Sequence, residues 1–349
     1  MKRIRIIAIA LLALILIGLG GYLFFMSGIE GPYKKVDVAS TLVKVEIPEG
    51  SSTSDIASVL VRNGIVSSTW KFRVFSRLND YDGKYLAGTY KLSPGMTSEE
   101  IANKICEGNQ DMTTVTIPEG YTIARIAEAF SDAGLVDKDA FIEATINGDY
   151  SKYDFLEGTV TGRHNLEGFL FPATYEFDED VTEEDIINEM LSQFGLVWEK
   201  YRDRAKELSM SPNEVITVAS LIEREAILDE DRRNVASVIY NRMAIDMPLQ
   251  IDATVDFALS LIGESHEYIT YEDLEIDSPY NTYKIYGLPP GPIACPGERC
   301  IEAALYPPDT EYLYYVKTTD QGVGMSFSTN YEDFVKDVEA WNATIENDD

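Results

Sequence analysis

The chain is poor in the residues that most metal sites and nucleophilic hydrolases use. It has two histidines, His164 and His266, about a hundred residues apart, and three cysteines without a CxxC spacing: Cys106, Cys295 and Cys300. We therefore expect no metal and no cofactor. The sequence also lacks a GxSxG elbow, which argues against a serine hydrolase. Cys295 and Cys300 are either a disulfide of an oxidising compartment or two incidental thiols.

Basic residues are scarce compared with acidic ones. The 349 residues include 29 Lys and Arg against 59 Asp and Glu, which gives a formal net charge of -30. Such a surface repels phosphates, so nucleic acid is not expected as a partner. Hydrophobic residues make up 45% of the chain, which is enough for a buried core in two or three domains.

One long uncharged run is present, near the N-terminus. It reads IIAIALLALILIGLGGYLFFM, residues 6–26, and follows the basic segment MKRIR. The run is longer than the roughly 7–15 apolar residues of a signal peptide and long enough to cross a bilayer of roughly 30 Å. We therefore expect a cytoplasmic tip and an uncleaved, single-pass transmembrane helix within residues 1–30. Everything after Gly31 would be an extracytoplasmic body held at the cell membrane.

Two parts of the chain repeat one pattern. VEIPEGSSTSDIASVLVRNGIVS from Val45 is matched 70 residues later by VTIPEGYTIARIAEAFSDAGLVD from Val115. GTYKLSPGMTSEEIANKI from Gly88 is matched 85 residues later by ATYEFDEDVTEEDIINEM from Ala173, so the second copy holds about 15 inserted residues. Each copy predicts a strand, a Pro-Glu-Gly turn, two helices and a second strand, which is a β-α-α-β unit.

This β-α-α-β unit resembles the LysM module, a small glycan-binding fold of cell-wall proteins, more closely in the first copy than in the second. The resemblance implies a LysM-like module at residues 40–108. Both copies are either glycan-binding or spacers for the next domain. The insertion in the second copy, GTVTGRHNLEGFLFPATY, ends in an aromatic turn that would line a cleft. Glu167 within it is a candidate substrate contact, although a surface or turn role is the favoured interpretation.

The stretch SPNEVITVASLIEREA predicts a helix that carries two acids. Ser211 at the N-cap, proline at the first helical position and Glu214 three residues after the cap form a capping box. One face of the helix is apolar: Val215, Val218, Ala219, Ile222 and Ala226. Glu223 and Glu225 fall on opposite shoulders of this face, so periodicity does not choose between them. Both also fit the polar rim of an ordinary amphipathic helix.

The neighbours of the two acids differ. Glu225 has bulky apolar neighbours and Asp229 at i+4, so desolvation and a like charge would both raise its pKa, which suits a general acid. Glu223 has smaller or more polar neighbours and would stay ionised more readily. The neighbours therefore favour Glu225 as the proton donor. A second helix is expected from about Asp231 to Ala244.

Irregular, proline-rich segments follow these helices and supply polar and aromatic side chains. The candidates are Gln250, Asp252, Tyr280, Asn281, Thr282 and Tyr283. Amides and tyrosines on loops suit a carbohydrate cleft, because sugar hydroxyls need donors and acceptors and sugar faces need flat apolar surface. Each of these residues is equally compatible with packing or capping a turn.

Six ordered stretches resemble the YceG-like family of endolytic murein transglycosylases. They are VASLIEREA, RRNVASVIYNRM, MPLQIDATV, SPYNTYKIYGLPPGPIACPG, AALYPPDTEYLYYV and SFSTNYEDF. The resemblance implies cleavage of the β-1,4 bond after N-acetylmuramic acid within nascent peptidoglycan, without water, leaving a 1,6-anhydro-muramoyl end. It also implies peptidoglycan strands as the substrate and work beside penicillin-binding proteins and the wall-synthesis machinery.

The same resemblance implies roles for individual residues. Glu225 would be the catalytic acid and then base, and Glu223 or Asp252 would be a supporting or second carboxylate. The resemblance also implies Gln250, Asp252, Asn281 and Tyr283 as cleft residues. Together with Thr282 and Glu167 from the loop and insertion patterns above, the substrate-binding candidates are Gln250, Asn281, Thr282, Tyr283 and Glu167. Two positions depart from the pattern. Ala226 follows the glutamate where broader lytic transglycosylases have a hydroxyl residue, and Ala253 stands where the family usually has proline.

Two other functions stay open at this point. One is a lysozyme-type hydrolase with Asp252 or Glu223 as the second carboxylate. The other is a non-catalytic, membrane-anchored protein that binds peptidoglycan. For the fold we expect an α+β chain with a transmembrane helix, a LysM-like module and an α+β lytic-transglycosylase domain at residues 110–345. This domain would include the second copy of the repeat and a late hairpin formed by EYLYYVKT and GMSFST.

Overall fold

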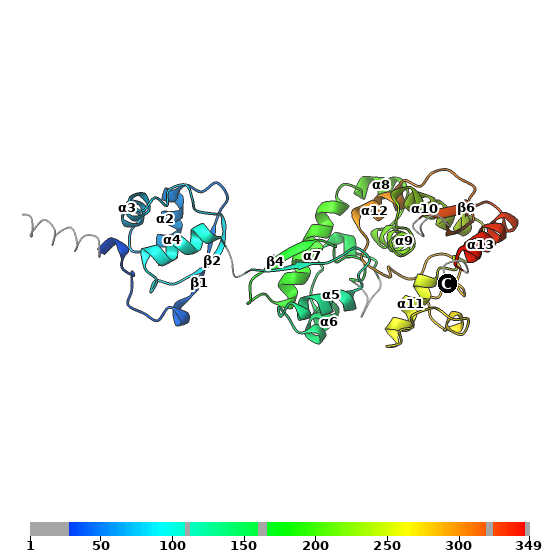
Figure 1. The fold of residues 1–349 in the computed structure, drawn as a ribbon, viewed down its shortest axis with the longest axis horizontal. Helices are drawn as coiled ribbons and strands as arrows, with labels where there is room; N and C mark the ends of the chain where they lie inside the picture. The colour runs from blue at the N-terminus through cyan, green and yellow to red at the C-terminus, as the bar shows by residue number, and fades with distance from the viewer. Residues whose placement is uncertain (1–27, 109–111, 160–165, 319–323, 346–349) are drawn as a thin grey trace, which may run out of the picture. The chain divides into compact units, whose positions relative to one another are not determined.

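The computed structural model describes residues 28–108, 112–159, 166–318 and 324–345. The chain forms two compact units, Met1–Met112 and Thr113–Asp349, and each mixes helices with small two-stranded sheets (Figure 1). The predicted α+β class is therefore confirmed. No helix within the described ranges is long and apolar enough to span a membrane, and the predicted span at residues 6–26 lies outside those ranges.

The first unit is built on one antiparallel strand pair and three helices. In chain order its elements are η1 (Ala39–Thr41), β1 (Val43–Ile47), α2 (Thr53–Arg62), α3 (Thr69–Leu78), β2 (Gly88–Leu92) and α4 (Ser98–Glu107). β1 pairs with β2, and alternate residues of both strands are buried against the helices. The predicted β-α-α-β unit of the first copy is confirmed.

The second unit begins with the second copy of this pattern. Its elements are β3 (Thr113–Thr116), α5 (Ile123–Asp132), α6 (Lys138–Asn147), η2 (Asp154–Leu156), β4 (Thr174–Phe177) and α7 (Glu183–Trp198). Val115 faces Tyr175 across the β3–β4 pair, as Val45 faces Tyr90 across β1–β2. The two copies therefore share their register, and the inserted residues lie between α6 and β4.

Side-chain caps explain where the repeated helices begin. Ser52 accepts a hydrogen bond from the backbone N–H of Asp55 at the start of α2, and Thr122 caps α5 at the equivalent position 70 residues later. Thr97 and Thr182, 85 residues apart, form capping boxes at the starts of α4 and α7. Each cap satisfies N–H groups that the first helical turn leaves without a partner.

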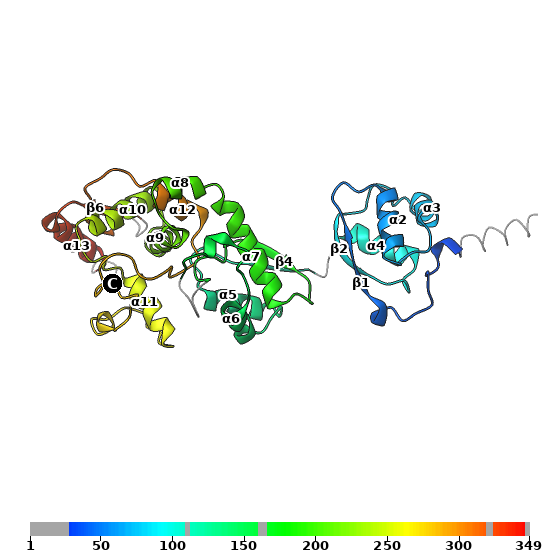
Figure 2. The same cartoon turned by 180° about the vertical axis from the view of Figure 1, so that it is seen from behind.

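The rest of the second unit is mainly helical and surrounds α9. Its elements are α8 (Arg202–Glu207), α9 (Pro212–Glu225), α10 (Asp229–Ala244), α11 (Asp252–Leu261), η3 (Asp273–Glu275), α12 (Glu298–Leu305), β5 (Tyr314–Lys317), β6 (Met325–Ser328) and α13 (Tyr331–Ile345). α9 packs against α10, α11 and α12, and both ribbon views place it among them (Figures 1 and 2). β5 and β6 form the predicted hairpin.

α9 is more deeply buried than its apolar arc predicts. The predicted capping box of Ser211 and Glu214 is present, but every residue from Val215 to Ile222 is buried. Within this stretch the Ser220 hydroxyl has internal partners, since it donates to the carbonyl of Thr217 and accepts the N–H of Ile293. Burial on all sides from Val215 to Ile222 makes α9 the central helix of the unit.

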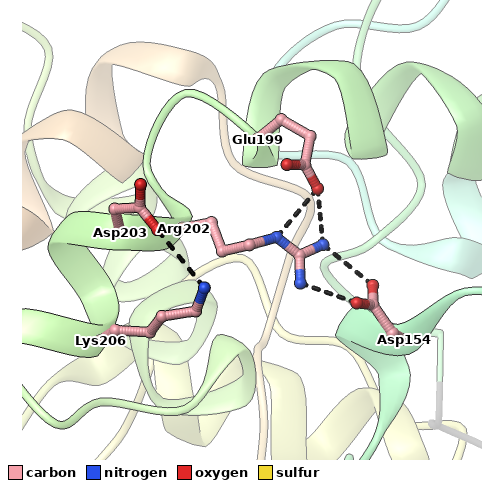
Figure 3. Close-up of polar contacts among 5 residues, drawn as sticks. All are labelled: Asp154, Glu199, Arg202, Asp203 and Lys206. Atoms are coloured by element: carbon pink, nitrogen blue, oxygen red, sulfur yellow. Dashed lines mark hydrogen bonds and ion pairs between the residues drawn. The ribbon is translucent and has the colours of Figure 1, made fainter.

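Arg202 ties the η2 turn, just before the insertion, to the end of α7 (Figure 3). Its guanidinium donates to both carboxylate oxygens of Asp154 in η2, at 2.7 and 2.9 Å, and to Glu199 at the end of α7, at 2.8 Å. Hydrogen bonding by Arg202 holds the pKa of Asp154 below its usual value. Two-pronged arginine–carboxylate pairs of this kind fix geometry as well as charge.

Both cysteines near the end of the second unit are thiols. Cys295 and Cys300 are buried and unpaired, so the disulfide alternative is wrong in this structure. Cys295 instead joins two backbone segments, because its N–H donates to Tyr121 and its carbonyl accepts the N–H of Gly120. The Pro-Glu-Gly turn of the second repeat is thereby held against the segment before α12.

Candidate functional site

Glu225 is the last residue of α9, and its carboxyl group accepts a hydrogen bond from a distant strand. The hydroxyl of Tyr315 in β5 donates to Oε2 of Glu225 at 3.1 Å. The two residues are 90 positions apart in the chain. The central burial of α9 fixes one partner and the β5–β6 hairpin fixes the other.

Burial raises the pKa of Glu225, and the carboxylate of Asp252 raises it further. The hydrogen bond from Tyr315 and the charge of Lys317 act in the opposite direction, because both stabilise the ionised form. The C-terminal end of a helix also disfavours a negative charge. The predicted direction of the pKa shift is confirmed, and a carboxyl group of this kind is suited to holding and then giving up a proton.

The prediction that Asp229 is the like-charge neighbour of Glu225 is wrong. Asp229 was expected one turn further along the same helix, but α9 ends at Glu225 and Ala226 has extended backbone angles. Asp229 begins α10 instead and forms ion pairs with Arg232 and Arg299. The charge that faces Glu225 comes from Asp252, the first residue of α11.

Asp252 and Tyr283 form a second hydrogen-bonded pair beside Glu225. The Tyr283 hydroxyl donates to Oδ1 of Asp252 at 2.5 Å. Burial raises the pKa of the Tyr283 hydroxyl, and the carboxylates of Asp252 and Glu225 raise it further. Since Asp252 is exposed at the start of its helix, it is a carboxylate that a ligand can approach.

Arg242 holds the segments that carry these groups. It is buried in α10, and its guanidinium donates to the carbonyl oxygens of Leu313 and Leu249, both at 2.7 Å. Leu313 lies two residues before Tyr315, and Leu249 lies three residues before Asp252. One buried arginine therefore positions both sides of the group around Glu225.

Glu223 has a different set of partners from Glu225. Its Oε2 accepts the backbone N–H of Gly297, the N-cap residue of α12, at 2.9 Å. Its charge also raises the pKa of Glu119 in the Pro-Glu-Gly turn, after the larger effect of burial. Glu223 thus links the end of α9 to the start of α12, and its contacts are those of a positioning residue.

The structure brings some of the substrate-binding candidates to the protein interior. Asn281 and Thr282 are fully buried. The Asn281 amide donates to the carbonyls of Leu274 and Ile276, both at 2.9 Å, and the Thr282 hydroxyl accepts the N–H of Ile251 at 2.9 Å. These two side chains therefore stabilise the loop from the protein interior, by hydrogen bonds to its backbone. Tyr280 is also buried, with its ring edge-on to Phe257.

Gln250 lies exposed just before α11. Its φ angle is 52°, in the left-handed region, and its backbone N–H donates to the carbonyl of Thr282 at 3.1 Å. A residue other than glycine with this backbone conformation is strained, and such strain gathers at functional sites. The turn at Gln250 directs the chain into α11, which begins with Asp252.

Glu167 is buried, so the favoured surface role is wrong, whereas its place in a turn is confirmed. Its carboxyl oxygens accept the N–H of Ile123 at 3.2 and 3.3 Å, at the start of α5. Burial raises the pKa of Glu167 to about 8, against the opposing effect of the hydrogen bonds from Ile123 and Gly168. The polar residues of the insertion suggested that Glu167 is exposed. In the structure its carboxyl group is instead the acceptor for a backbone N–H that the first turn of α5 leaves without a helical partner.

Sequence reasoning missed Tyr315, Lys317 and Arg242. A signal was present for the first two, because residues two apart on a strand point to one face. Nothing in the sequence indicated that this face would meet the end of α9. Within the described ranges, no group of three or more His, Cys, Asp or Glu side chains is arranged to hold a metal ion. The arrangement suits proton transfer by one carboxyl group with a second carboxylate close by.

Comparisons with known proteins point to one family. Residues 45–340 match the YceG-like family. The chain is 40% identical over 312 residues to an endolytic murein transglycosylase of Bacillus subtilis, covering 85% of this chain and 84% of that protein. It is 32% identical over 353 residues to an endolytic murein transglycosylase of Streptococcus pneumoniae, covering 94% of this chain and 63% of that protein. A crystal structure of a YceG-like protein of Listeria monocytogenes is similar, with 39% identity, a TM-score of 0.59 and coverage of 84% of this chain and 98% of that one.

Proposed function

Because the chain belongs to the YceG-like family, we propose that it is an endolytic murein transglycosylase, a lyase that cuts within peptidoglycan strands. The observation that carries the mechanism is the single carboxyl group of Glu225, whose pKa is raised by burial and which Tyr315 orients. Glu225 would cleave the β-1,4 bond after N-acetylmuramic acid. One residue is sufficient, because the substrate supplies its own nucleophile.

In the first step, protonated Glu225 gives its proton to the glycosidic oxygen as the bond to C1 of the muramoyl residue breaks. The leaving sugar departs with a free hydroxyl group. The raised pKa favours the protonated form of Glu225 that this step needs. The positive charge that develops at C1 is favoured by the carboxylate of Asp252, which the hydrogen bond from Tyr283 holds in place.

In the second step, the C6 hydroxyl of the same muramoyl residue attacks C1. Glu225, now a carboxylate, accepts the hydroxyl proton and returns to its starting state. The product is a 1,6-anhydro-muramoyl end, and no water is consumed. The hydrogen bond from Tyr315 stabilises the carboxylate between the two steps.

A lysozyme-type hydrolase is the second candidate, and one observation favours it. Asp252 faces Glu225 closely enough for its charge to raise the pKa of Glu225, as a paired carboxylate would. A hydrolase would use Asp252 as a nucleophile or to activate water. The two candidates differ in the fate of water, so their products separate them.

The remaining parts of the proposal concern location and partners. Residues 6–26 would anchor the protein in the cell membrane and hold the body outside the cytoplasm, near newly made strands. The first unit would serve as a LysM-like module, and its β-α-α-β order supports this interpretation.

Penicillin-binding proteins of the wall-synthesis machinery would be neighbours of the protein. The alternative of a non-catalytic, membrane-anchored protein that binds peptidoglycan implies the same location, but under it no cleavage product forms.

Product analysis tests the proposal. Long uncrosslinked glycan is incubated with the wild-type protein in water enriched in oxygen-18, and the new ends are analysed by mass spectrometry. We expect anhydro-muramoyl ends, which are about 18 Da lighter than reducing ends and carry no oxygen-18, because the C6 oxygen of the substrate closes the ring. Reducing ends labelled with oxygen-18 would establish the hydrolase instead. Glycan that stays uncut would support the non-catalytic peptidoglycan-binding protein.

A further inference from the structure

A large pocket lies beside the catalytic group, inside the second unit. It has a volume of about 730 Å³ and lies between the start of α5 and one side of α11. Both helices lie below α9 in Figure 1. Its lining includes Arg125 from α5, Arg224 from α9, Asp256 and Ser260 from α11, and Glu167. Glu225 is not part of this lining, so the pocket is an adjoining site.

The pocket offers positive charge in a chain with a formal net charge of -30. Arg125 is exposed and stacks over the ring of Tyr121, with its guanidinium carbon 4.4 Å from the ring centroid. Within the part of the chain that the structure describes, no carboxylate lies within ion-pair distance of Arg125. Arg224 pairs with Asp256 at 3.1 Å, and both side chains remain partly exposed. Among the described residues Arg125 thus has no carboxylate partner, and its guanidinium can pair with a ligand carboxylate.

The buried acid of the pocket does not oppose such a ligand. Glu167 lies at the start of α5 with its oxygens on the N–H of Ile123. Since burial raises the pKa of Glu167 to about 8, its carboxyl group is mostly neutral at pH 7. The apolar part of the lining, which includes Ile142, Phe257 and Leu261, suits the side chains of a short peptide.

The geometry connects this pocket to the catalytic group. Arg224 directly precedes Glu225 in α9. Asp252, Asp256 and Ser260 are spaced four residues apart on α11, so they follow one side of that helix. At about 1.5 Å per residue, Ser260 lies roughly 12 Å from Asp252 along the helix axis. A sugar held at Glu225 could thus place an attached group of a few residues in the pocket.

We propose that this pocket binds the peptide that murein carries on its muramic acid residues, with a peptide carboxylate against Arg125. The inference rests on the proposed function, since it names the part of the same substrate that the pocket would hold. The occupant would be a short peptide with at least one free carboxylate. The pocket would make the enzyme prefer strands whose peptides are intact over bare glycan.

Peptide binding tests the pocket without relying on catalysis. A synthetic stem peptide with free carboxylates is titrated calorimetrically into the full chain carrying Glu225→Gln. We expect binding that weakens about tenfold when Arg125→Gln is added, as the loss of one charge-assisted contact predicts. The matched control Arg73→Gln changes an exposed arginine of the first unit and should leave affinity unchanged. Equal affinity with and without Arg125→Gln, or no binding at all, would overturn the proposal.

Cleavage rates give an independent readout of the same pocket. Wild-type and Arg125→Gln proteins are compared on strands with peptides and on strands stripped by an amidase. We expect Arg125→Gln to lower kcat/KM about tenfold on the first substrate and to leave the second unchanged. Equal losses on both substrates would contradict a peptide site. If the wild-type protein cuts neither substrate, the proposed function fails, and the peptide titration still decides the pocket.

Discussion

At the scale of single residues, the chemistry depends on the hydrogen bond from Tyr315 to Glu225. This bond favours the ionised carboxylate, so Tyr315→Phe should raise the pKa of Glu225 further. Because Glu225 must be protonated for the first step, activity is lost as pH rises through that pKa. The basic limb of the pH profile should therefore move to higher pH, while kcat falls about tenfold as the positioning contact is lost.

The neighbouring Tyr314 provides a matched control. Its ring stacks on Phe334 and lies under the guanidinium of Arg242, without a hydrogen bond to Glu225. Tyr314→Phe should leave the basic limb in place. A basic limb that moves to lower pH in Tyr315→Phe would show that the hydroxyl does not act on Glu225 as described.

The raised pKa of Glu167 predicts that the free energy of unfolding depends on pH. Its folded pKa of about 8 lies above the ordinary value of 4.5, so its contribution to stability is fully present below about pH 4.5 and is lost as pH rises towards 8. The difference in unfolding free energy between the wild type and Glu167→Gln isolates this group from other titrations. We expect that difference to fall across this window with a slope of at most about 1.4 kcal/mol per pH unit. A difference that is constant with pH, measured by chemical denaturation, would contradict the assignment.

Residue patterns predicted some of the site and misjudged other parts for physical reasons. The bulky neighbours of Glu225 correctly indicated a raised pKa, because helical spacing fixes which side chains surround a residue. The prediction that Asp229 raises the pKa of Glu225 was wrong, because α9 ends at Glu225, before Asp229. Asn281 and Thr282 were candidate substrate contacts or turn caps, and in the structure their polar groups satisfy buried backbone. A buried irregular loop needs such partners, and polarity alone does not distinguish them from ligand contacts.

At the scale of elements, the position of Glu225 depends on where α9 begins. The Ser211 hydroxyl accepts the N–H of Glu214, and the Glu214 carboxylate accepts the N–H of Ser211 at 2.8 Å. Ser211→Ala should lower the free energy of unfolding by about 1 kcal/mol, as measured by urea denaturation. Ser211→Thr retains a hydroxyl and should lose less. Equal losses in the two variants would show that the cap does not stabilise the helix.

Local signals predicted the repeated elements well. The capping residues, the Pro-Glu-Gly turns and the strand residues Tyr90 and Tyr175 all act within a few positions, and the strand register agrees between the copies. The contact between β5 and the end of α9 could not be predicted in this way. It joins residues 90 positions apart, and the buried Arg242 of α10 holds the segment just before Tyr315 in place.

At the scale of the whole molecule, the two units have separate hydrophobic cores. Leu60 is fully buried in the core of the first unit and Leu191 in that of the second. We expect two calorimetric unfolding transitions. Leu60→Ala and Leu191→Ala should each lower only one of them, by about 2–5 kcal/mol in unfolding free energy. A single transition that both substitutions shift would show that the units unfold together.

The central claim is that one carboxyl group, that of Glu225, carries the reaction. Single-turnover cleavage of uncrosslinked glycan by the full chain tests it with Glu225→Gln and Glu223→Gln, each checked for an unchanged unfolding midpoint. We predict that Glu225→Gln lowers the rate of anhydro-end formation by about 10²–10⁴-fold. Glu223→Gln retains an acceptor for the N–H of Gly297 and should keep most of the rate. If Glu223→Gln abolishes the reaction and Glu225→Gln does not, the assignment is reversed.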